Sequence, residues 1–174
     1  MKSTEIIETL RQKLTVPVGR HLYGVLGTYS QLDEFAKKLH QARTTDGVVF
    51  PKPTNVNRGI LGAIPDDEFK RLAENEAKRP EPTAAHVGRA FERFLNAQLA
   101  EKKPLVLSNL EMLFAYHVEL SLLRTRAADE NRVVLLLPGR KSRDRIVMFH
   151  EMSGSDSTLP TNLIAENHLW EIGE

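Results

Sequence analysis

The sequence predicts an α/β fold with three layers around an open, mostly parallel β-sheet. Two observations carry this prediction: strand-like segments alternate with amphipathic helical segments along the 174 residues, and the run 133–137 is apolar throughout. An uninterrupted apolar run is typical of a parallel strand that is covered on both faces. The chain shows no internal repeat and no clear boundary, so residues 1–174 are expected to form a single domain.

The first half of the chain is predicted to contribute two helices and two strands. Apolar side chains recur at helical spacing over 4–14, so residues 1–15 are expected to hold an N-terminal helix. Residues 21–27 are expected to form a strand that leads through a turn into the second helix. Residues 47–50 are predicted to be a short buried strand, and residues 51–65, rich in Pro, Asn and Gly, a long loop.

The second half is predicted to alternate in the same way. Helices are expected at about 67–78, from Thr83 onward and over 113–127, and strands at 105–107, 133–137, 145–149 and 168–172. Because proline disrupts regular backbone pairing, Pro80 and Pro82 are expected to end one helix and Pro138-Gly139 to break a strand.

Composition narrows the range of functions. The chain is 41% hydrophobic and 27% charged, with a formal net charge of +1, so bulk electrostatics gives no reason to expect nucleic acid or an anionic membrane as the main partner. Absence of cysteine excludes disulfides, thiol catalysis and thiolate metal sites. The N-terminus lacks the apolar core of a signal peptide and no apolar run is long enough to span a bilayer, so a cytoplasmic location is expected.

The turn after the first predicted strand is a candidate site for a nucleotide phosphate. Gly24, Gly27, Thr28 and Ser30 lie where a strand passes into a helix, and backbone N–H groups at the start of a helix attract anions. A working P-loop has the pattern G-x-x-x-x-G-K-[ST], whose lysine reaches the terminal phosphates. No lysine lies in this turn, so a plain strand-to-helix turn is the alternative.

The segment 105–111 resembles a Walker B strand in its position. Such a strand ends in an aspartate that reaches magnesium, whereas Ser108 stands at that point here. Glu111 could polarise a water molecule, but without a metal ion and phosphates it would have nothing to act on. The alternative, that Ser108 or Asn109 caps the following helix, is preferred.

A basic cluster follows the apolar strand 133–137. It consists of Arg140, Lys141, Arg143 and Arg145. Because ligands of open α/β sheets bind at the carboxyl ends of strands, a phosphate, an acidic protein or a nucleic-acid backbone could dock there. A solvated turn that keeps the protein soluble is the alternative.

Other patterns that would indicate chemistry are missing from the sequence. The six histidines include no pair with H-x-x-x-H spacing, and no G-x-S-x-G elbow is present. No cofactor, no metal ion and no catalytic residue are therefore expected, and the chain is predicted not to be an enzyme.

The order of elements resembles an AAA-like P-loop fold without a working P-loop. Within it, the segment 104–172 is similar to the small accessory proteins of bacterial BREX phage-exclusion systems, of the BrxB and BrxF types. The similarity lies in a strand and acidic turn (residues 105–114), a helix, an apolar strand that ends in Leu137-Pro138-Gly139, and a strand that ends at Phe149.

This resemblance implies a non-catalytic adaptor in phage defence that binds a larger partner, a PglZ-type protein similar to alkaline phosphatases. The partner is expected to contact the turn Pro138–Arg145, with the 51–65 segment beside it, or else an apolar helix face such as Val87, Phe91 and Leu95. Two other functions remain open from the residues alone. One is a nucleotide-binding ATPase or switch with a divergent P-loop, and the other is a nucleic-acid-binding module.

Overall fold

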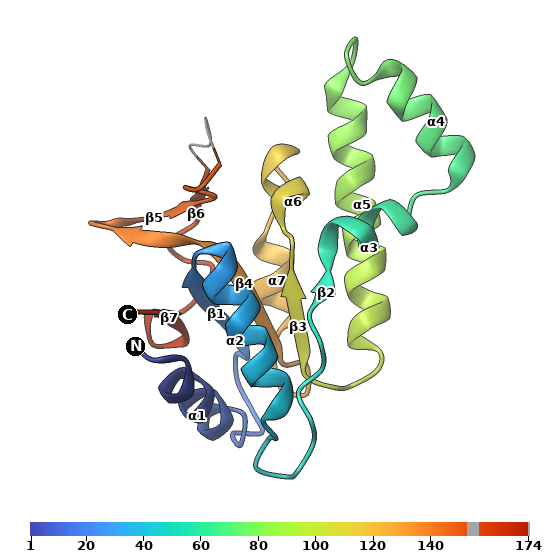
Figure 1. The fold of residues 1–174 in the computed structure, drawn as a ribbon. Coiled ribbons are helices and arrows are strands. Elements are labelled where there is room, and N and C mark those ends of the chain that lie inside the picture. The colour runs from blue at the N-terminus through green and yellow to red at the C-terminus, as the bar shows by residue number, and fades with distance from the viewer. Residues whose placement is uncertain (153–156, 174) are drawn as a thin grey trace.

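A seven-stranded sheet flanked by helices forms the centre of the protein (Figure 1). The computed structural model describes residues 1–152 and 157–173, apart from the side chains of residues 80 and 81. Five strands run parallel in the order β2-β3-β4-β1-β7, and β5 and β6 extend β4 as an antiparallel ribbon. The strands are β1 Leu22–Gly27, β2 Thr54–Asn55, β3 Leu105–Ser108, β4 Val133–Ser142, β5 Arg145–Met148, β6 Thr158–Leu159 and β7 Leu169–Glu171. The predicted three-layer, mostly parallel α/β fold is therefore confirmed.

Helices cover both faces of the sheet. They are α1 Ser3–Lys13, α2 Tyr29–Gln41, α3 Val56–Gly62, α4 Asp66–Asn75, α5 Pro80–Leu99, α6 Glu111–Ala115 and α7 Ser121–Arg126, with a 3-10 turn at Glu166–His168. The helix expected within residues 1–15 is thus present. In the described part of the chain, no helix combines the length and the apolar character that crossing a membrane needs.

The central strands alternate their side chains between two buried cores, as a strand with both faces covered must. In β4, Val134 and Leu136 pack with α1 and α2 on one face, whereas Val133, Leu135 and Leu137 pack with α3, α5, α6 and α7 on the other. This explains why 133–137 is apolar at every position. The connection after β1 therefore lies on one face of the sheet, and the connections after β3 and β4 lie on the other.

The segment 47–65 differs from its prediction. Residues 47–50 lie outside the sheet and form only an isolated bridge from Val49 to Arg43. The segment 51–65, predicted to be a loop, contains β2 and the whole of α3. The side chain of Asn55 caps α3 by accepting a hydrogen bond from the N–H of Arg58 at 3.0 Å. The same asparagine that suggests a loop in the sequence therefore starts a helix.

Strand β4 continues through Pro138-Gly139, where a break was predicted. It is parallel to β1 as far as Pro138, which lies opposite Gly27, and from Gly139 it pairs with β5 in the antiparallel sense. A Cβ atom at Gly139 would lie 2.6 Å from the carbonyl oxygen of Val147, so the close approach of β5 requires glycine there. The two residues mark a change of partner strand and not an end.

Two helix predictions also need correction. Pro80 and Pro82 lie in the first turn of α5, where the missing N–H groups cost nothing, so they begin a helix and do not end one. The predicted helix over 113–127 is divided into α6 and α7, because His117 adopts a left-handed backbone conformation with φ of 50°.

A cluster of titratable rings lies near the starts of β1 and β7, where His21 and Tyr23 are buried and His168 is half-buried. The Nδ1 atom of His21 lies 2.8 Å from the hydroxyl of Tyr23, whose ring packs 4.6 Å from that of His168. Burial, and secondarily the charge of Arg132, lowers the pKa of His21; burial, and secondarily Lys13, lowers the pKa of His168. Burial also raises the pKa of Tyr23 to about 12. The folded protein therefore favours the neutral form of both histidines.

We expect the melting temperature to fall as the pH falls from 7.5 to 5.5. The unfolded chain binds protons on these histidines near their ordinary pKa of about 6.5, before the folded chain does, so stability is full above that pH and is lost below it. A difference of one unit between the pKa of a group in the folded and in the unfolded chain changes the free energy of unfolding by about 1.4 kcal/mol. For His168→Phe, the melting temperature should fall less steeply with pH than for the wild type. The variant His117→Asn, at an exposed position, should match the wild type. The same dependence of melting temperature on pH in all three proteins would contradict the prediction.

Candidate functional site

The carboxyl ends of β1, β3 and β4 meet at the point where the fold predicts a ligand. Strands β1 and β4 are neighbours, and the chain leaves them toward opposite faces of the sheet. In open α/β sheets ligands bind in the crevice at such a switch point. The polar side chains gathered there come from the start of α2, the start of α3, the start of α6 and the segment after β5.

The start of α2 is occupied by groups of the chain itself. Thr28 and Gln31 form a capping box, in which the Thr28 hydroxyl accepts from the Gln31 N–H at 3.2 Å and the Gln31 side chain accepts from the Thr28 N–H at 2.9 Å. The N–H of Tyr29 donates to the Glu151 carboxylate at 2.8 Å. Because an anionic side chain already lies against the positive end of α2, a phosphate would have to displace it.

Glu111 is held by hydrogen bonds on both of its oxygens. Oε1 accepts from the hydroxyl of Tyr29 at 3.0 Å, and Oε2 accepts from the side-chain amide of Asn57 at 2.9 Å. Asn57 in turn accepts from the N–H of Met112 at 3.0 Å. Burial, together with the hydrogen bond to Glu111, raises the pKa of the Tyr29 hydroxyl above its ordinary value. Glu111 therefore joins α2, α3 and α6 as a structural acceptor.

The cavity at this edge is small and has no cation in its wall. It holds about 70 Å³, and its described lining contains Asp33, Ser108 and Asn109 but neither lysine nor arginine. Pockets that take small organic ligands usually hold roughly 300–1,000 Å³. In the described part of the chain, no group of three or more histidine, aspartate or glutamate side chains is placed to hold a metal ion.

The structure gives the members of the candidate phosphate turn different roles. Gly24 lies within β1, where an added Cβ atom would lie 2.7 Å from side-chain carbons of both Ile164 and Leu169, so its role is close packing. Gly27 ends β1, Thr28 caps α2, and Ser30 is exposed on the first turn of that helix.

Three members of the network were not singled out in the sequence. Tyr29, Asn57 and Glu151 meet Glu111 or α2 only through contacts between residues 54 to 122 positions apart. Asn57 also fell in a segment that was predicted to be a loop. Only the sheet topology brings these residues together, and no local pattern marks them.

The cluster Arg140, Lys141, Arg143 and Arg145 lies on the ribbon of β4 and β5, which we call the basic hairpin (residues 140–145). A turn at Arg143 and Asp144 joins the two strands, with Arg143 at φ of 54°. The ribbon projects from the body of the protein (Figure 1). All four cationic side chains are exposed, and none forms an ion pair with any residue of 1–152 or 157–173.

The basic hairpin has a buried base and an apolar groove beneath it. Residues 133–139 of β4 are all buried, so the ribbon extends from the centre of the fold. A groove of about 360 Å³ lies between the hairpin and the segment that leads to β7. Its wall combines three cationic side chains, two carboxylates and several apolar side chains. These are Lys141, Arg143 and Arg145, then Asp144 and Glu166, with Leu159 and Ile164 among the apolar ones. The hairpin thus offers an excess of cationic side chains beside a partly apolar depression.

The other surfaces expected to contact a partner are placed differently. Val87, Phe91 and Leu95 are at most 2% exposed and belong to the core, so they offer no free helix face. Strand β2 and helix α3, which occupy most of 51–65, lie at the sheet edge opposite β7, whereas the groove of the basic hairpin adjoins β7. Searches of protein-family models, curated proteins and solved structures find no match to this chain.

Proposed function

We propose that this chain is a non-catalytic adaptor that binds a larger protein through the basic hairpin. The single observation that carries this proposal is the projecting ribbon with four exposed cationic side chains and no ion pair within residues 1–152 and 157–173. Holding cations on a rigid ribbon lowers the entropy lost when a partner orders them. Arginine is enriched at protein interfaces because its planar fork pairs with carboxylates in bidentate fashion.

The carboxyl edge of the sheet supports a function without nucleotide chemistry. Catalysis of phosphoryl transfer depends on cations and aligned donors that stabilise developing negative charge. Here Glu111 and Glu151 occupy this edge and engage three donors, which are the N–H and the hydroxyl of Tyr29 and the side-chain amide of Asn57. Two carboxylates beside an incoming phosphate would repel it.

The partner is proposed to present an acidic surface with an apolar side chain at its centre. Carboxylates would pair with Arg140, Arg143 and Arg145, and the apolar side chain would fill the groove beside Leu159 and Ile164. The resemblance of residues 104–172 to BREX accessory proteins supports a role in phage defence and a PglZ-type protein as that partner. Co-purification of the tagged chain from its native host, followed by mass spectrometry, tests this: a PglZ-type protein is the expected companion.

We expect no hydrolysis of ATP or GTP by the purified chain in the presence of magnesium. The turn after β1 lacks a lysine, and Glu111 is committed to Tyr29 and Asn57. A phosphate-release assay measures this directly, with Glu111→Gln as the matched variant. Turnover that Glu111→Gln abolishes would overturn the non-catalytic assignment, and nucleotide-induced amide shifts confined to residues 28–31 would establish a nucleotide switch instead.

The positive charge of the basic hairpin also makes nucleic acid a second candidate partner. Contacts of four cations with phosphates would give an affinity that falls steeply as salt rises. Titration of a fluorescent DNA or RNA duplex at low and moderate salt separates the candidates. Absence of binding at low salt would leave an acidic protein as the ligand of the hairpin.

A further inference from the structure

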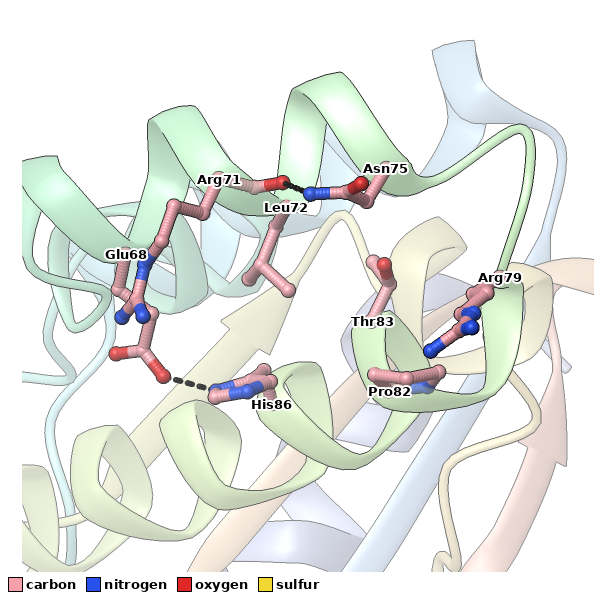
Figure 2. Close-up of a pocket in the computed structure, with 8 residues that line it drawn as sticks. All are labelled: Glu68, Arg71, Leu72, Asn75, Arg79, Pro82, Thr83 and His86. Carbon is pink, nitrogen blue, oxygen red and sulfur yellow. Dashed lines mark hydrogen bonds and ion pairs between the residues drawn. The ribbon is translucent and has the colours of Figure 1, made fainter.

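A second cavity lies far from the basic hairpin, between α4 and the first turns of α5 (Figure 2). It holds about 460 Å³, which is within the range of about 300–1,000 Å³ typical of sites for small ligands. Helix α4 has no fully buried side chain, so it borders this space without filling it. Leu72 of α4 and Pro82 of α5 supply apolar wall.

Two guanidinium groups lie on opposite sides of the cavity. Arg71 projects from α4, and Arg79 comes from the connection to α5, as Figure 2 shows. Neither side chain has an ion pair or a hydrogen bond with residues 1–79, 82–152 or 157–173. No residue in those ranges therefore pairs with either guanidinium group.

The one acidic side chain in the described lining contacts a histidine. Glu68 of α4 forms an ion pair with Nδ1 of His86 on α5, and this contact closes one end of the cavity (Figure 2). Two guanidinium groups and one carboxylate therefore border the cavity, so its described lining is cationic on balance.

A buried hydroxyl also faces the cavity. Thr83 is only 6% exposed, and its oxygen points into the space between α4 and α5 (Figure 2). A hydroxyl that faces the cavity can donate a hydrogen bond to an oxygen atom of a ligand. Thr83 lies in the first turn of α5.

We propose that this cavity binds a small phosphate monoester with an apolar body. A phosphate has several terminal oxygens, so it can accept from guanidinium groups and from the Thr83 hydroxyl together, and charge-assisted bonds of this kind are the stronger ones. The apolar body packs against Leu72 and Pro82. This site is independent of the basic hairpin and of the adaptor function.

Calorimetric titration of the full chain with phenyl phosphate tests the proposal. Phenol, which lacks the anion, and inorganic phosphate, which lacks the apolar body, are both expected to bind more weakly. Replacing Arg71 and Arg79 by glutamine should weaken phenyl phosphate by at least about tenfold, because hydrogen bonds to a charged group are lost. Amide shifts in the NMR spectrum should centre on Leu72, Asn75 and Thr83.

The matched control is the double variant Lys70→Gln and Lys78→Gln. Each of these lysines adjoins one of the two arginines in sequence and is exposed, but neither lines the cavity, so the net charge changes equally. Its affinity for phenyl phosphate should stay near that of the wild type. Equal weakening in the two doubles, or equal binding of phenol and phenyl phosphate, would overturn the site. Circular dichroism confirms that α4 is intact in both, and Thr83→Val, which removes only the hydroxyl, should also weaken binding.

Discussion

Changing Arg140, Lys141 and Arg143 together to glutamate is expected to abolish recovery of the partner protein while the fold stays intact. The three side chains are exposed, so reversing them should move the melting temperature little; surface substitutions usually cost within about 0.5 kcal/mol. At an interface, however, each reversal places like charges against the acidic partner and costs several kcal/mol. Co-purification measures the loss of the partner, and a thermal melt measures the stability of the fold.

A matched triple reversal at Lys37, Lys52 and Arg89 controls for net charge. These side chains are also exposed but lie away from the basic hairpin. The control should retain the partner. Partner recovery from the hairpin variant would move the interface elsewhere on the molecule. Loss of the partner together with a collapse in melting temperature would mean that the hairpin is part of the structural framework.

Replacing Gly24 by valine is expected to be among the most destabilising single changes in the chain. Even a Cβ atom there would come within 2.7 Å of side-chain carbons of Ile164 and Leu169 and 3.0 Å of Leu137. Valine adds two further methyl groups to a packed core, so we expect a loss of about 3 kcal/mol, the upper part of the usual range for overpacking. Thermal or urea unfolding measures the change, which should appear as a melting temperature lower by roughly 6–12 °C.

The control is Gly88→Ala, which should act in the opposite direction. Gly88 lies within α5, its backbone is helical, and nothing lies within 4 Å of an added Cβ atom. Alanine in such a position should stabilise the helix by roughly 0.5–1 kcal/mol. If Gly24→Val were tolerated as well as this change, the close packing of the segment 160–169 against β1 would not hold, and the glycine would need another explanation.

The sequence predicted best those elements whose pattern depends on burial alone. Strands β3 and β4 are apolar runs because both of their faces are covered, and helices α1 and α2 show one apolar face each. Strand β2 could not be recognised, since two residues carry no periodicity and its place is fixed by pairing with β3. The proline and glycine at 138–139 suggest a break, yet the strand continues because β5 pairs with it there.

The candidate site was predictable only in part for a similar reason. Thr28 and Glu111 stand out because each begins a helix after a strand, and both do lie at the carboxyl edge of the sheet. Their neighbours Tyr29, Asn57 and Glu151 depend on contacts across the fold. The α4–α5 cavity depends on how two helices diverge, and the residues of one helix alone do not encode that angle.

The lengths of the outer strands bear on how the protein behaves at high concentration. The parallel sheet ends in β2 and β7, which have two and three residues, while the longer β1 and β4 are paired on both sides. At about 3.3 Å per residue, each open edge exposes only a short row of unpaired backbone groups. Long, flat edges act as templates for aggregation, and short edges oppose it. The architecture therefore disfavours filament growth through its own sheet and leaves association to side-chain surfaces.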